Sequence, residues 1–252
     1  MALRIPITTG EVNESNFSPQ VMLNDKKVVS LYIFWIRQIQ IMSTDSQPTK
    51  MCLVRPFFLQ RYKKLETRIK NTREEFAAEV KRCRDIYEKK TRDYGTSWRV
   101  LRLPSLTDQI FIKANRIRSI QESGVNLVGD DFTGEFVAMV NYCVMALIQQ
   151  ELGGNGEMEL PLTRALELYD KHINRTTELM FNKNHDYGEA WRQMRISSMV
   201  DLILMKLRRI KQIEDNQGKT LISEGVEGSY MDIINYSLFC LIRLTEDANQ
   251  QA

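Results

Sequence analysis

The stretch Asp93-Tyr94-Gly95-Thr96-Ser97-Trp98-Arg99 returns 93 residues later as Asp186-Tyr187-Gly188-Glu189-Ala190-Trp191-Arg192. Because a core tolerates swaps among apolar side chains of similar volume, a purely structural repeat would keep only its apolar pattern. Here polar identities are kept, which indicates a duplicated domain whose copies retained a shared site or a shared set of polar contacts. The further pairs are Arg102/Arg195, Ser105/Ser198, Asp108/Asp201, Lys113/Lys206, Arg116/Arg209 and, after one inserted residue, Asn141/Asn235 and Tyr142/Tyr236.

The pattern after residue 70 is helical in both copies. Two capping boxes, Thr72-x-x-Glu75 and Ser105-x-x-Asp108, predict the starts of the first two helices. The expected helices are 72–90, 105–124, 132–152, 163–183, 198–217 and 228–244. A unit of three helices is too thin to bury its third, almost wholly apolar helix. We therefore predict an all-α fold of two tandem three-helix units, packed face to face as an intramolecular pseudo-dimer.

The domain organisation follows from the same repeat. We expect a weakly ordered N-terminal extension (1–70), a first unit (71–152), a linker (153–162) and a second unit (163–252). Residues 1–70 have no counterpart in the repeat, and they mix loop composition with two short apolar runs that read as short strands or collapsed segments. They are either an arm private to this protein or sequence upstream of the natural start codon.

Composition narrows the class of protein. With 43% hydrophobic and 27% charged residues, the 252-residue chain is ordinary globular protein. A net charge of +3 is too small to indicate nucleic acid as a partner. The longest apolar run near the start, 31–36, falls far short of the roughly 20 residues that cross a bilayer. Four cysteines without a CxxC pair and two unclustered histidines give no zinc motif. A cytoplasmic protein with no membrane partner is the expectation.

Taken together, a DYGxxW turn, a KxxR helix and a helix with Asn-Tyr, each present twice, resemble the nucleotide modification associated domain 1 family over roughly residues 72–245. That family is similar to the MazG-like all-α NTP pyrophosphohydrolases. The resemblance implies a MazG-like helical bundle that binds a nucleotide with Mg²⁺, and release of pyrophosphate from a (d)NTP as the reaction. The ExxE and ExxD helices that hold the metal in MazG-like enzymes are absent from this sequence.

Metal-ligand candidates are acids, because Mg²⁺ prefers hard oxygen ligands. The second unit offers Glu178, Asp186 and Asp232, with Asn235 one helical turn from Asp232. The first unit has acids at the first two of these positions, Asp85 and Asp93. At the third it has Ala138, and Glu135 lies one turn away. Either one complete and one decayed site exist, or the sites are composite across the pseudo-dimer; we favour the site that contains Asp232.

The remaining candidates have both a binding and a structural interpretation. Lys206 with Arg209, and Lys113 with Arg116, lie at i, i+3 on one helix face and would bind phosphate or belong to a solvated face. Tyr187 or Trp191 would flank the base, although a Trp is more often part of a core. Asp108 and Asp201 suit helix capping, and Asp93 and Asp186 suit a turn.

Two other functions stay open. One is a catalytically inactive nucleotide-binding or scaffold protein. The other is nucleic-acid binding through four arginines in matched loops: Arg99, Arg102, Arg192 and Arg195. The sequence does not decide which nucleotide is bound, whether it is hydrolysed, whether one or two sites exist, or whether pseudo-dimers pair into a further homo-oligomer.

Overall fold

The computed structural model describes residues 51–127, 129, 131–153, 157–187, 189–219 and 225–251. These residues form helices and connecting loops, and no strand occurs in these ranges, which confirms the all-α prediction. The elements are α2 (Met51–Tyr94), η3 (Ser97–Val100), α3 (Leu103–Ser123), α4 (Thr133–Leu152), α5 (Leu162–Tyr187), η4 (Ala190–Gln193), α6 (Ile196–Asp215) and α7 (Glu227–Gln251).

The predicted helix starts were wrong at both capping boxes. Helix α2 begins at Met51, so Thr72 lies inside it, and residues 51–70, which include one of the two apolar runs, are helical rather than strand-like. Helix α3 begins at Leu103 after an extended Arg102, and Pro104 occupies its first turn, where the missing N–H costs nothing. Ser105 is therefore already helical. The expectation for residues 1–50 lies outside the described residues.

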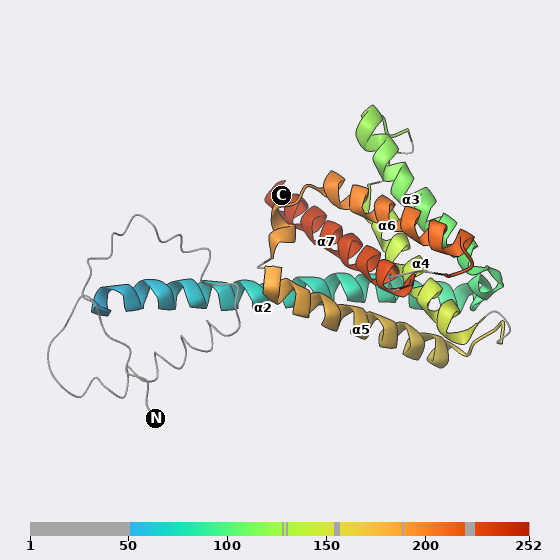
Figure 1. The fold of residues 1–252 in the computed structure, drawn as a ribbon, viewed down its shortest axis with the longest axis horizontal. Helices are drawn as coiled ribbons and strands as arrows, with labels where there is room; N and C mark the ends of the chain where they lie inside the picture. The colour runs from blue at the N-terminus through green and yellow to red at the C-terminus, as the bar shows by residue number, and fades with distance from the viewer. Residues whose placement is uncertain are drawn as a thin grey trace, which may run out of the picture.

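The six α-helices of the described residues form two units that repeat in chain order. Helix α2 precedes α3 and α4 as α5 precedes α6 and α7, with the short helices η3 and η4 at matching positions. Each helix packs against its own counterpart: α4 against α7, α3 against α6, and α2 against α5. Figure 1 shows α2 and α5 running side by side, with the N-terminal part of α2 extending beyond the other helices.

The first helix of each unit packs against the third helices of both units. Helix α2 contacts α7 of the other unit as well as its own α4, and α5 correspondingly contacts α4 as well as its own α7. This reciprocal pattern is that of a pseudo-two-fold axis, in agreement with the predicted intramolecular pseudo-dimer. The core lies where α4 and α7 cross, and many of their apolar side chains are fully buried, among them Phe136, Val140, Tyr230 and Ile234. Each such burial stabilises the fold by about 1.5–3 kcal/mol, and neither unit alone could provide it.

Within the described residues, no helix is both long enough and apolar enough to cross a membrane.

Candidate functional site

In the first unit, the Lys–Arg pair of α3 is held by an acid of α4. Arg116 donates a hydrogen bond to Oε1 of Glu135 at 2.6 Å, and the ammonium of Lys113 lies 3.1 Å from Oε2. Arg116 also reaches Oδ1 of Asn126 at 3.5 Å. The Glu135 side chain is only 12% exposed. The two cations are therefore neutralised in part by a carboxylate of their own unit.

In the second unit, the acid lies one helical turn further along. Lys206 on α6 donates to Oδ2 of Asp232 on α7 at 2.7 Å, and Lys183 on α5 donates to Oδ1 at 3.0 Å. Ser229 stands where the first unit has Glu135. Among the described residues, no acid pairs with the guanidinium of Arg209. The structure thus brings together Asp232 and Lys206, and it leaves the arginine one turn after Lys206 without an acid partner among the described residues.

Two tyrosines border this cluster. Burial raises the pKa of Tyr236, and the charge of Asp232 raises it further while Lys183 lowers it. Tyr187 also raises the pKa of Tyr236. The side chain of Tyr187 lies at the end of α5 and is 74% exposed. The first unit repeats this neighbourhood, since burial and then Tyr142 raise the pKa of Tyr94. An exposed tyrosine at the end of the first helix therefore lies near the tyrosine of the third helix in each unit.

The described side chains do not fit a Mg²⁺ ion. Both carboxylate oxygens of Asp232 are engaged by ammonium groups, and Glu178 is exposed on α5 without a contact to this cluster in the described part of the chain. No group of three or more acidic, His or Cys side chains that could hold a metal occurs among the described residues. The side chain of Asp186, the third predicted ligand, lies outside the described residues.

Asn235 and its repeat partner differ in their hydrogen bonds. Asn141 donates to the carbonyl of Cys83 at 3.1 Å and accepts from the hydroxyl of Tyr169 at 2.9 Å. The residue that corresponds to Tyr169 in the repeat is Phe76, which has no hydroxyl. Within the described part of the chain, the buried Oδ1 of Asn235 accordingly has no hydrogen-bond partner.

The repeated tryptophans are buried. Trp191 is 6% exposed, stacks on Phe239 with ring centroids 4.3 Å apart, and donates from Nε1 to Asn184 at 3.1 Å. Trp98 is buried to a similar extent. The indole of Trp191 has almost no free surface for a nucleobase, which favours the core interpretation, and Tyr187 is the more accessible aromatic side chain.

The arginine after each tryptophan fixes the loop between the first two helices of its unit. Arg99 is 3% exposed and donates to Oε1 of Gln149 at 2.5 Å, while Nε2 of Gln149 donates to the carbonyl of Leu101 at 3.0 Å. In the second unit Arg243 replaces Gln149 and donates to the corresponding carbonyl of Met194 at 3.2 Å. Arg99 is thus a structural residue.

Arg192 is largely enclosed, with its side chain 11% exposed, in an ion cluster that joins α2 to the second unit. Its guanidinium donates to Glu75 on α2, to Glu189 at 3.0 Å and to Glu246 on α7 at 2.5 Å, and to the hydroxyl of Thr72 at 2.8 Å. Two of the four arginines that could have bound nucleic acid are therefore internal, while Arg102 and Arg195 are exposed.

The capping prediction for Asp108 and Asp201 was wrong, because these acids pair across the pseudo-two-fold axis. Asp108 on α3 lies 2.5 Å from Lys211 on α6, and Asp201 on α6 lies 3.6 Å from Arg118 on α3. The N-caps of α3 and α6 make no side-chain cap hydrogen bond. The two ion pairs are equivalent at the repeat spacing, which explains why both acids were kept.

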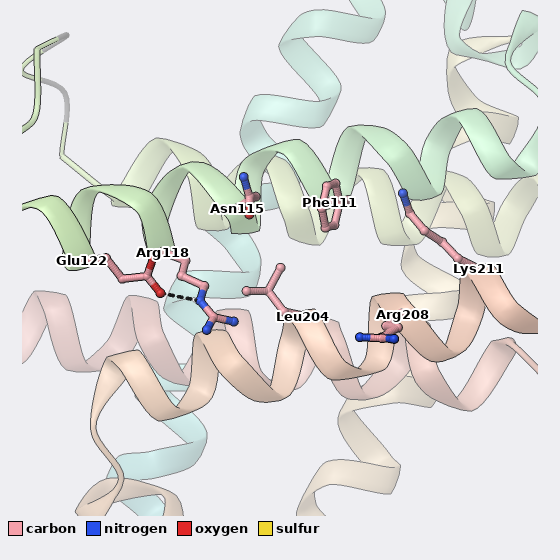
Figure 2. A pocket seen from close by; sticks show the side chains of 7 residues that line it. All are labelled: Phe111, Asn115, Arg118, Glu122, Leu204, Arg208 and Lys211. Carbon is pink, nitrogen blue, oxygen red and sulfur yellow. Dashed lines mark hydrogen bonds and ion pairs between the residues drawn. The ribbon is translucent and has the colours of Figure 1, made fainter.

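Between α3 and α6 lies a groove of about 480 Å³ that the sequence did not suggest (Figure 2). Phe111 faces Leu204 across it, Lys211 lies 4.2 Å from the Phe111 ring, and Arg118 pairs with Glu122 at 2.8 Å. The lining residues are repeat-equivalent pairs except for Glu122: Phe111/Leu204, Asn115/Arg208 and Arg118/Lys211. Because its lining residues are equivalent at the repeat spacing, the repeat itself could have indicated this groove in the sequence.

Two three-helix units with matched polar contacts, related by a pseudo-two-fold axis, define an all-α tandem-repeat protein. Residues 90–150 and 183–244 both match the family described as nucleotide modification associated domain 1. Each of the two repeat units belongs to this family, as the DYGxxW and KxxR motifs suggested. No curated protein and no solved structure matches the chain.

Proposed function

We propose that the chain binds the phosphate groups of a nucleotide at the second unit, on the surface formed by Lys183, Lys206, Arg209 and Asp232. The observation that carries the proposal is the guanidinium of Arg209. Its counterpart Arg116 is engaged by Glu135, whereas no acid among the described residues pairs with Arg209. A planar guanidinium that binds no acid in the described part of the chain suits bidentate binding of phosphate oxygens.

The surrounding groups support the same ligand. Asp232 holds the ammonium groups of Lys183 and Lys206 at one point between three helices, so the cations are ordered before a ligand arrives. Three cations against one acid leave an excess of positive charge. The exposed ring of Tyr187 lies close enough to act on Tyr236, which borders Asp232, and it is available to stack on a base. The family description also points to nucleotides.

The (d)NTP pyrophosphohydrolase reaction is the further possibility to test. In the described arrangement Asp232 is occupied by lysines, so we derive no metal-assisted step from it. Mg²⁺ would reach the site as the counter-ion of the nucleotide phosphates, to which it binds in solution. Buried free thiols at Cys83, Cys143 and Cys240 fit a protein of the reducing cytoplasm.

The test is calorimetric titration with a nucleoside and its mono-, di- and triphosphates, with and without Mg²⁺, and with pyrophosphate release measured in parallel. We expect affinity to rise with the number of phosphates. Arg209→Gln should weaken binding about tenfold to a hundredfold, the loss of one hydrogen bond to a charged group.

The matched control is Arg208→Gln, one residue earlier on α6, because Arg208 lines the groove toward α3 (Figure 2). Equal affinity for nucleoside and triphosphate, or equal losses in the two variants, would reject the proposal. No binding by the wild-type chain would favour the scaffold interpretation. Pyrophosphate release that depends on Arg209 would extend the proposal to catalysis.

A further inference from the structure

The two units place their acid at different positions of the same helix. In the first unit Glu135 bridges Lys113 and Arg116, and Ala138 follows one turn later. In the second unit the corresponding residues are Ser229 and Asp232. The acid of the first unit thus pairs with Arg116 and Lys113, whereas the acid of the second unit pairs with two lysines. This difference changes which cation of each unit is available to a ligand.

We infer that the first unit contains a second phosphate-binding site that is closed by the carboxylate of its own Glu135. The inference rests on the proposed function of the second unit. Glu135 contacts Arg116 at 2.6 Å and Lys113 at 3.1 Å, and these are the two cations whose counterparts would bind phosphate. A carboxylate and a phosphate present similar oxygens to a guanidinium. The side chain thus occupies the position of a bound anion.

Glu135 competes effectively with a free anion for these two cations because it is part of the same chain. A tethered group meets its partner at an effective concentration in the millimolar range or above, and it needs no loss of translational freedom. It also lies in the first turn of α4, where the helix dipole stabilises a negative charge. A free anion at ordinary concentration would have to displace this carboxylate, and the first unit would stay unoccupied.

The fold does not need the acid at this particular position. The second unit forms the same three helices with Ser229 in place of Glu135 and its acid at Asp232. Helix α7 still packs against α6 as α4 packs against α3. In the second unit the ion pair between these helices is made one turn later, by Asp232 and Lys206, so packing of the two helices does not require the acid to lie beside the arginine.

The test exchanges the two residues and counts bound inorganic pyrophosphate by calorimetric titration of the full chain. We expect one bound pyrophosphate for wild type, two for Glu135→Ser and none for Ser229→Glu. The double exchange should again bind one, now at the first unit. Glu122→Gln, which removes another acid paired with an arginine of α3, is the control and should stay at one.

The outcomes separate the two claims. The inference would be overturned if wild type and Glu135→Ser each bound one pyrophosphate and the variant had the melting temperature of wild type. The proposed function would then remain intact. Two sites in wild type would overturn it as well. Absence of binding in wild type and in Glu135→Ser would reject the proposed function itself. Glu135→Gln, which keeps the volume and removes the charge, provides the same count if the serine variant does not fold.

Discussion

Replacing Arg192 by methionine should strongly destabilise the protein. The guanidinium is only 11% exposed, and it bonds to carboxylates from α2, from the η4 loop and from α7. One of these, Glu189, is 2% exposed. Without the arginine this carboxylate would lose its Arg192 ion pair and stay buried close to the acids Glu75 and Glu246, of which Glu246 keeps Arg243 at 3.6 Å.

The magnitude follows from the uncompensated charge. Removing one partner of a buried ion pair costs about 3–5 kcal/mol. For a chain of this size that loss corresponds to a fall in melting temperature of about 6–20 °C. Arg195→Met is the matched control, because Arg195 is exposed three residues further on and a surface substitution changes stability by about 0.5 kcal/mol or less.

Urea unfolding followed by far-UV circular dichroism would measure both variants against wild type. A loss below about 1 kcal/mol for Arg192→Met would refute the reasoning. An equal loss in Arg195→Met would do the same, since the effect would then not depend on burial. Restoration of stability in Arg192→Met by Glu189→Gln would support it, because that change removes the buried charge.

Two further predictions concern buried polar groups. Asn141→Leu should lower stability by about 1–3 kcal/mol, because it leaves the hydroxyl of Tyr169 unpaired; Asn235→Leu, whose Oδ1 has no described partner, should cost less in the same urea experiment. Burial lowers the pKa of His172 below its ordinary 6.5, with Glu151 opposing the shift. The unfolded chain therefore binds more protons between the folded pKa and 6.5, so stability should fall as pH drops through that window. His172→Gln should flatten this part of the profile, and an unchanged slope would contradict the assignment.

The architecture could be predicted from the sequence because the spacing of the repeat indicates which residues occupy equivalent positions in the two units. The 93-residue spacing identified which residues are equivalent, and equivalent residues do lie at equivalent places: Asp108 and Asp201 each pair with a cation of the opposite unit. The spacing could not name those partners. Lys211 is far from Asp108 along the chain, and only the packing of α3 on α6 brings them together.

Local signals failed where tertiary structure overrides them. Thr72-x-x-Glu75 has the form of a capping box, yet both residues bind Arg192 from the middle of α2. The start of α3 is set by an extended Arg102 followed by Pro104, so the serine one residue later does not cap it. At the candidate site, the retained Lys–Arg pairs were visible in sequence. Their different acid partners were not, because Glu135 and Asp232 approach from another helix.

The packing of each first helix on both units has an evolutionary consequence. A single-unit ancestor with this packing would expose the face of its third helix that α4 and α7 bury against each other, so it would need a second copy to cover that face, as an obligate homodimer does. In such a dimer every substitution appears in both halves at once. Joining two copies in one chain would remove that restriction, so a difference such as that between Glu135 and Ser229 can alter one half and leave the other as it was.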